Sequence, residues 1–266
     1  MTDSSDHALA IAAHPDDIEF MMAGTLLLLK ESGCTIHMWN LGSGSCGTET
    51  LSREEIVRIR RREAQASAEI AGAVLHPPIA DDIEIFYDHG LIRKAAAVVR
   101  DIRPRIILIP SPEDYMEDHL TTARITVTAA FVRGMINYDT DPPRPPWSEP
   151  TALYHAMPHG LRDQLRRRVT PDRYVDILTV FGCKRDMLAC HASQKDWLDR
   201  SQGIGAYLGL MEAMCREVGT MSGRFELAEG WRRHLHWGFG PEEYDPLGER
   251  LGSDCYVVPG CGDAPG

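Results

Sequence analysis

The chain alternates short apolar runs with longer segments of mixed polarity, the pattern of alternating strands and helices. Residues 8–13 form a continuous apolar run of strand length, and residues 105–110 are the clearest strand-like run after it. Such runs are typical of strands that are buried on both faces of a parallel sheet. The pattern therefore predicts an α/β fold in which helices flank a mostly parallel sheet.

The remaining segments extend this alternation along the chain. Ser52 and Glu55 fit a capping box that opens a long helix. Five prolines between residues 141 and 150 predict an irregular connection, and the C-terminal portion is less regular. Further strands are expected at 34–41, 73–79, 151–157 and 173–178, and helices at 18–29, 52–71, 91–102, 121–135, 181–199 and 203–217. We expect one domain over residues 1–266, with residues 1–7 and 253–266 as loose tails.

Both clear apolar runs end in residues that can do chemistry. The first run ends in His-Pro-Asp-Asp at residues 14–17, and the second leads into the acidic segment 111–119, which ends at His119. Proline restricts the residue before it to extended backbone, so the first strand should end at His14. Since ligands of open α/β sheets bind beyond the carboxyl ends of the strands, we expect the two segments to meet there.

These residues can supply a metal site with a separate base. Two histidines and one carboxylate are a common ligand set of catalytic zinc, and His14, Asp17 and His119 can provide it. Asp16 then lies beside the metal without binding it. It can accept a proton from water whose pKa the ion lowers, which is the chemistry of carbonyl or phosphoryl hydrolysis.

Structural roles compete with this interpretation. A single histidine at a strand end is most often a hydrogen-bonded structural residue, and Asp114 and Asp118 could serve as turn or helix-cap residues. The glycine-rich segment 42–47 could cradle a phosphate, but it fits neither the P-loop nor the dinucleotide spacing. The metal site is favoured because two polar segments each follow a buried strand.

Composition excludes several classes of partner. The net charge of −11 argues against nucleic acid or an anionic membrane as the main partner. No apolar run reaches the roughly 18 residues that a membrane span requires, and the polar N-terminus predicts no signal peptide. Seven scattered cysteines without a Cys-x-x-Cys pair fit a reduced, cytoplasmic protein.

Two motifs carry a resemblance to a known family. Residues 13–17 resemble the Ala-His-Pro-Asp-Asp signature of the PIG-L/LmbE-like zinc-dependent N-acetylglucosaminyl deacetylases. Residues 114–119 are similar to that family's Asp-Tyr-His-Pro-Asp-His. The resemblance extends over about residues 8 to 232. Weaker similarities occur at Arg60-x-x-Glu63, at Asp88, at Lys184 to Gln194 with its His191-Ala-Ser-Gln ending, and at Ala228-Glu229-Gly230-Trp231.

The resemblance implies a fold and a reaction. It implies a Rossmann-like sheet, Zn²⁺ or another divalent metal held by His14, Asp17 and His119, and Asp16 as general base. Metal-activated water would attack the acetyl carbonyl of a small N-acetylated amino-sugar conjugate and release acetate. The resemblance also implies a homo-oligomer, a trimer or hexamer, in some members.

The resemblance also implies which residues bind the sugar. Arg60 and Asp88 would lie in the sugar pocket. One departure matters: the family usually has a histidine at Met116, where it helps to stabilise the tetrahedral oxyanion. Methionine cannot donate a hydrogen bond.

Either another residue donates this hydrogen bond, or the activity is weak, or the substrate differs. His191 is the histidine that we expect to act as the catalytic substitute. His159, His234 and His236 are further candidates, the last two also from a neighbouring subunit.

Two other functions stay open. The same metal could serve hydrolysis of a different amide, for instance in an antibiotic or another secondary metabolite. Alternatively, the chain could be a metal-binding subunit that has lost catalysis through Met116. The presence of Asp16 argues against that last function, because a structural metal needs no spare carboxylate beside it.

Overall fold

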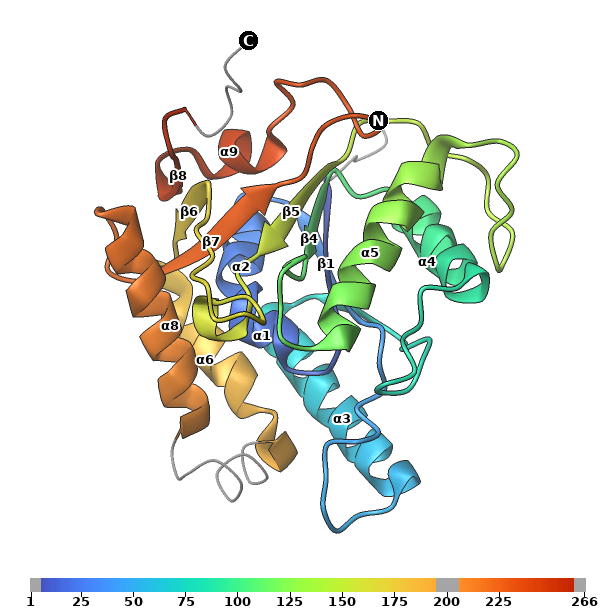
Figure 1. Ribbon diagram of the computed structural model, residues 1–266, viewed down its shortest axis with the longest axis horizontal. Coiled ribbons are helices and arrows are strands. Elements are labelled where there is room, and N and C mark those ends of the chain that lie inside the picture. Colours follow the sequence, from blue (N-terminus) through green and yellow to red (C-terminus); the bar gives the residue numbers. More distant parts are fainter. Residues whose placement is uncertain (1–5, 195–205, 261–266) are drawn as a thin grey trace.

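An eight-stranded sheet runs through the computed structural model, which describes residues 6–194 and 206–260 (Figure 1). The strand order is β3-β2-β1-β4-β5-β7-β6-β8; the first five are parallel and the last three are added antiparallel. The expectation of an α/β fold with a mostly parallel sheet is confirmed. The strands are β1 His7–Ala12, β2 Thr35–Asn40, β3 Val74–His76, β4 Ile106–Ile109, β5 Ala152–Ala156, β6 Arg173–Asp176, β7 Ala228–Arg233 and β8 Cys255–Val257.

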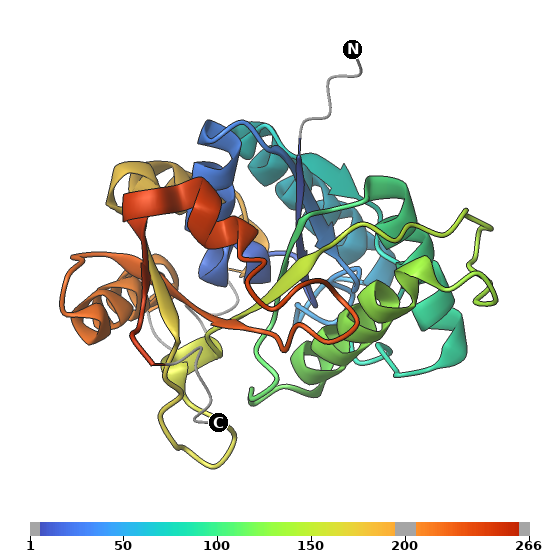
Figure 2. The same ribbon diagram turned by 90° about the horizontal axis from the view of Figure 1, so that it is seen from above.

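Helices cover both faces of this sheet (Figures 1 and 2). Residues of β1 point alternately into two cores: Leu9 and Ile11 pack against α4 (His89–Ile102) and α5 (Glu117–Phe131), and Ala8 and Ala10 face the opposite side. The opposite side is covered by α2 Ala23–Glu31, α3 Arg53–Ala71, α6 Phe181–Ala189, α8 Ala206–Ser222 and α9 Pro246–Leu251. Short 3₁₀ helices occupy Val132–Gly134, His159–Leu161, Leu178–Val180 and Gly252–Asp254.

The helix expected at 18–29 is two helices, α1 (Asp17–Met21) and α2, because a buried ion pair enters the backbone between them. Lys184 Nζ donates to the carbonyl of Phe20 (2.9 Å), and Glu229 accepts from the amide of Gly24 (2.8 Å). In a continuous helix these two backbone groups would bond to each other. A side chain at Gly24 would collide with Ile177, so glycine permits the close approach.

Three other expectations need correction. Helix α5 begins at Glu117 rather than near 121, so His119 lies in its first turn and not in a loop. The prediction of loose tails at residues 1–7 and 253–266 is wrong for the described part of each: His7 begins β1, and residues 255–257 form the edge strand β8. Strand β7 was not predicted, because its charged residues are not typical of a buried strand. Residues 195–199 and 203–205 of the expected helices lie outside the described residues.

No helix among the described residues is long and apolar enough to cross a membrane.

Three histidines form a row across the neighbouring strands β1, β2 and β3. His37 on β2 is hydrogen-bonded to His7 on β1 (2.9 Å) and to His76 on β3 (3.0 Å). Burial, with the adjacent histidines, lowers the pKa of His37 to about 4. The folded chain thus holds a neutral imidazole where the unfolded chain would bind a proton near pH 6.5.

This row predicts acid sensitivity. Because the unfolded state binds the His37 proton at a higher pH than the folded state, stability is complete above about pH 6.5 and falls as the pH approaches 4. Between pH 7.5 and pH 5, His37→Leu should lose about 1 kcal/mol less unfolding free energy than the unsubstituted chain, allowing for partial exposure. Urea unfolding with a chelator at both pH values measures this, and equal losses would contradict it.

Candidate active site

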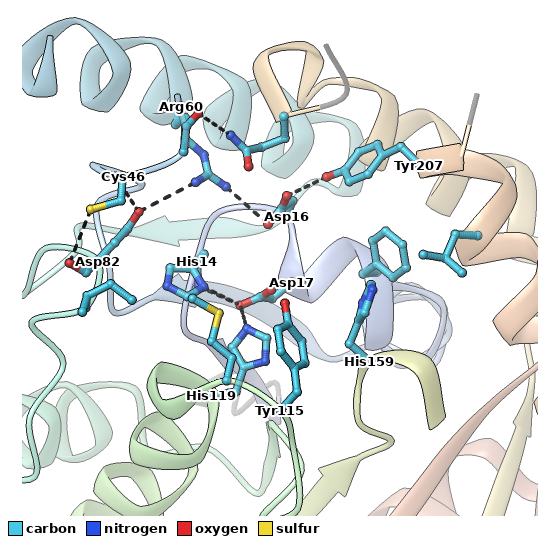
Figure 3. Close-up of a pocket in the computed structure, with 16 residues that line it drawn as sticks. His14, Asp16, Asp17, Cys46, Arg60, Asp82, Tyr115, His119, His159 and Tyr207 are labelled. Atoms are coloured by element: carbon cyan, nitrogen blue, oxygen red, sulfur yellow. Dashed lines mark hydrogen bonds and ion pairs between the residues drawn. The ribbon is translucent and has the colours of Figure 1, made fainter. Parts of the chain in front are cut away.

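A cavity of about 230 Å³ opens at the carboxyl ends of β1 and β4 (Figure 3). The loop after β1, helix α1 and the first turn of α5 bring His14, Asp17 and His119 to its wall. This is where the parallel strands predicted a ligand site. The cavity is also lined by Asp16, Phe20, Cys46, Gly47, Arg60, Asp82, Ile83, Tyr115, Met116, His159, Gln194, Tyr207 and Leu210.

The three expected metal ligands converge. One ligand atom from each of His14, Asp17 and His119 lies within 4.8 Å of the other two. The carboxylate Oδ2 of Asp17 is 3.5 Å from His14 Nδ1 and 3.4 Å from His119 Nε2. Two ring nitrogens and a carboxylate oxygen in this arrangement form a donor set that accepts zinc and other divalent metals.

Two buried carboxylates orient these histidines. His14 Nε2 donates to Asp118 Oδ2, and His119 Nδ1 donates to Asp114 Oδ1, each at 2.9 Å. The opposite ring nitrogens are thereby left to face Asp17. Carboxylate–histidine pairs of this kind hold the imidazole in the tautomer that binds metal. The sequence alone indicates turn and cap roles for Asp114 and Asp118, and it does not show that their carboxylates reach the two histidines.

The charges of these residues act strongly on one another. Burial alone would lower the pKa of His14, but hydrogen bonds to Asp118 and Asp17 outweigh it and raise the pKa to about 9. Desolvation would raise the pKa of the partly buried Asp17, yet the adjacent His119 and His14 hold it well below the usual range. The site therefore concentrates protons that an incoming metal ion must displace.

Asp16 points away from these ligands. Its backbone has φ 111°, in the left-handed region, and this turns its side chain toward Arg60 and Tyr207. The Tyr207 hydroxyl donates to Asp16 Oδ2 (2.7 Å), and an Arg60 guanidinium nitrogen lies 3.3 Å from Asp16 Oδ1. Burial raises the pKa of Asp16, against the opposing charge of Arg60. Tyr207, on α8, is a contact that sequence reasoning missed.

The two residues expected to bind the sugar lie in different environments. Arg60 lines the cavity, donates to the carbonyl of Pro15, and lies 4.0 Å from Asp82. Asp88 is exposed and caps α4 by accepting from the amide of Leu91 (2.9 Å), away from the cavity lining.

Asp82 lies where Asp88 was expected. It lines the cavity, and it accepts the amides of Gly44 (2.7 Å) and Cys46 (2.9 Å). Two amides of the glycine-rich loop are thus bonded to a carboxylate rather than free to cradle a phosphate.

The histidines considered as replacements for the missing oxyanion donor also separate. His191 is fully buried behind the cavity, with Nε2 3.0 Å from Glu19 Oε1, and it does not line the wall. His234 pairs with His155 (2.9 Å), also away from the cavity lining, and His236 lies in the same loop. Of these candidates, His159 lines the cavity together with Met116.

The comparisons with known proteins agree with this geometry. The family model described as GlcNAc-PI de-N-acetylase matches residues 9–130, which include all three candidate metal ligands. A diacetylchitobiose deacetylase of Thermococcus kodakarensis is 31% identical over 216 residues, covering 76% of this chain and 78% of the relative. The chain belongs to the PIG-L family of de-N-acetylases.

Other relatives widen the range of reactions within this PIG-L fold. A 4-oxalmesaconate hydratase of Pseudomonas putida is 26% identical over 225 residues, covering 82% of this chain and 84% of the relative. The solved N,N'-diacetylchitobiose deacetylase of Pyrococcus horikoshii superposes with a TM-score of 0.73 at 22% identity, covering 89% of this chain and 86% of that one. The superposition on the Pyrococcus horikoshii structure shows that the two chains share a fold.

The buried carboxylates of this PIG-L site predict a change in metal affinity. Asp118→Asn should weaken zinc binding about 10- to 100-fold, because the amide no longer holds His14 in the metal-binding tautomer as a carboxylate does. Competition with a chromophoric chelator measures the affinity. Asp88→Asn is the matched control, since asparagine also caps helices and Asp88 lies away from the site. Equal zinc affinity in the Asp118 variant and the control would contradict the prediction.

Proposed function

We propose that this chain is a zinc-dependent deacetylase that removes an N-acetyl group from a small amino-sugar conjugate. One observation carries the proposal: a complete three-residue donor set has a separate, partly buried carboxylate, Asp16, beside it in the same cavity. A metal that only stabilised the fold would need no such carboxylate. The names of the deacetylase relatives support the acetamide as the target.

The donor set fits a catalytic metal. His14 and His119 each present one ring nitrogen toward Asp17 while the other is held by a carboxylate. These three residues would hold the ion and leave a coordination position open. When bound, the ion would polarise the acetamide carbonyl and lower the pKa of water.

Asp16 is the proposed general base and then the general acid. It accepts a proton from the attacking water as the water oxygen bonds to the carbonyl carbon and the C=O π pair moves onto oxygen. The C=O double bond then re-forms as the C–N bond breaks, and Asp16 returns its proton to the departing nitrogen. The remaining proton of the attacking water passes from the acid product to the amine, so that acetate and an ammonium group result. Tyr207 and Arg60 fix the carboxylate in place for both transfers.

The charge of the cavity favours a neutral substrate. Arg60 is the only lysine or arginine among the described lining residues, and the carboxylates of Asp16 and Asp82 beside it balance its charge. We propose that Arg60 and Asp82 bind hydroxyl groups of the sugar, and that Asp82 has the role expected of Asp88. His191 then acts by positioning α1 through Glu19 rather than by touching substrate.

Hydration is the second candidate function. It is favoured by the hydratase relative and by the absence of the usual oxyanion donor at Met116. Adding water to a carbon–carbon double bond would use the same metal and base. A carboxylate substrate, as the relative's name indicates, would however need cationic partners beyond Arg60. Hydrolysis of another amide would use the same residues but would release no acetate from N-acetylglucosamine conjugates.

The proposal predicts that Asp16→Asn abolishes turnover while the metal stays bound. The amide cannot take a proton from water, so acetate release should fall at least about 100- to 10,000-fold. Acetate is measured from a panel of N-acetylglucosamine conjugates with zinc-loaded protein, and bound zinc is measured in the same samples.

Asp163→Asn is the control, because Asp163 lies in an exposed turn away from the cavity lining. Undiminished acetate release in the Asp16 variant would remove Asp16 as the base. If the unsubstituted enzyme releases no acetate from any conjugate, the deacetylase proposal fails, and hydration of unsaturated carboxylates becomes the next reaction to assay.

A further inference from the structure

The cavity lacks an obvious donor at the position next to the metal ligands. Met116 lines the wall three residues before His119, and its thioether has no proton to donate. Any addition of water to a carbonyl places negative charge on the carbonyl oxygen, and hydrolases stabilise that charge with a positioned donor. Apart from the candidate metal ligands, His159 is the only histidine among the described residues that lines the wall, but the residue directly before Met116 offers a hydroxyl.

We propose that the Tyr115 hydroxyl donates the hydrogen bond that stabilises the oxyanion, in the place of the donor absent at Met116. The inference rests on the proposed function. Figure 3 shows the Tyr115 hydroxyl directed into the cavity toward Asp17, between His119 and His159. It therefore points to the place where the three metal ligands converge.

The ring of Tyr115 is positioned by the rings on either side of it. It meets His119 edge-on, with centroids 5.8 Å apart and planes at 82°, and it contacts His159 at 5.9 Å. His159 packs in turn on Phe20 (5.0 Å), and its backbone amide donates to Asp114 Oδ2 (3.3 Å). The carboxylate that orients the ligand His119 thus also anchors His159, which makes His159 a positioning residue for Tyr115.

Among the described residues the Tyr115 hydroxyl has no hydrogen bond to give up. Within residues 6–194 and 206–260, no hydrogen-bond partner of the Tyr115 hydroxyl is found, whereas Tyr207 donates to Asp16 and Tyr154 to Asp245. A tyrosine hydroxyl keeps its proton at neutral pH, because the ordinary pKa of the phenol is about 10. A protonated hydroxyl without a partner can donate to an oxyanion with no bond to give up.

The first test separates catalysis from binding. Tyr115→Phe should lower kcat about 100-fold and change KM less than about threefold, because the bond forms only when charge develops on the carbonyl oxygen. Tyr87→Phe is the matched control: Tyr87 is also partly exposed, and its hydroxyl bonds to Thr128 (2.9 Å) outside the cavity lining. Unchanged kcat in the Tyr115 variant would overturn the proposal.

The second test needs no turnover. Methylphosphonate is a tetrahedral anion with an oxygen at the position of the oxyanion, and acetate is planar without it. Calorimetry with zinc-loaded protein should find methylphosphonate binding at least about tenfold weaker in Tyr115→Phe, with acetate binding unchanged. Equal methylphosphonate affinity in the two proteins would overturn the Tyr115 assignment. A wild-type enzyme that releases no acetate would instead overturn the deacetylase proposal, and methylphosphonate would still decide the role of Tyr115.

Discussion

Two neighbouring carboxylates must point in different directions for this site to exist. Asp17 faces the two histidines, and Asp16 faces Arg60 and Tyr207. The left-handed backbone at Asp16 (φ 111°) produces this separation, and a residue other than glycine adopts it only at an energetic cost. Arg60 stabilises the turn, because its guanidinium bonds to the carbonyl of Pro15 and lies against the Asp16 carboxylate. Arg60 therefore stabilises the turn at Asp16 and also lines the cavity.

The same constraint explains why distant parts of the chain carry family-like motifs. Helix α1, which bears Asp17, has only five residues and cannot hold its own position. Its C-terminal end is tied by Lys184 to the carbonyl of Phe20, and Lys184 pairs with Glu229 at 2.5 Å with both side chains buried. Removing one partner of such a pair would leave a buried charge without compensation.

The middle of α1 is tied by a second buried group. Glu19 accepts from Ser67 on α3 (2.6 Å) and lies 3.0 Å from His191 Nε2. In the same region Glu63 accepts from the amide and hydroxyl of Ser193. The segment 184–194 therefore clamps the helices that carry the site, which accounts for a histidine in that segment without any contact to the cavity.

The sequence predicted the parts of the site that depend on local order. Strand ends in a parallel sheet must meet at one edge, so His14, Asp17 and His119 could be brought together from two apolar runs and the residues that follow them. Tyr207 could not be found this way, because α8 approaches Asp16 only through the packing of the C-terminal half. Strand β7 was missed for a related reason: its Glu229 is polar by type, but it is buried by pairing with Lys184.

The choice between Asp82 and Asp88 shows a second limit. Both follow β3, and only the loop path decides which one turns inward. Asp82 binds the amides of the glycine-rich loop, while Asp88 begins α4. The donor at Met116 was likewise sought by residue type among the histidines, although a tyrosine hydroxyl donates as well.

The deacetylase and hydratase relatives of this chain also indicate where specificity resides. Both kinds of reaction add water to a carbon that is polarised, and a metal with a base beside it serves either one. The proposed metal ligands and the proposed base Asp16 would then serve both reactions alike and would not select the substrate. Selection must come from the groups that meet the rest of the molecule: the hydroxyl of Tyr115 on one side, and the Arg60–Asp82 pair on the other. The proposed donor lies beside the candidate metal ligands, and on the opposite wall the charge of Arg60 is balanced by Asp82. This arrangement suits a neutral substrate whose carbonyl becomes an oxyanion better than it suits a polyanionic substrate.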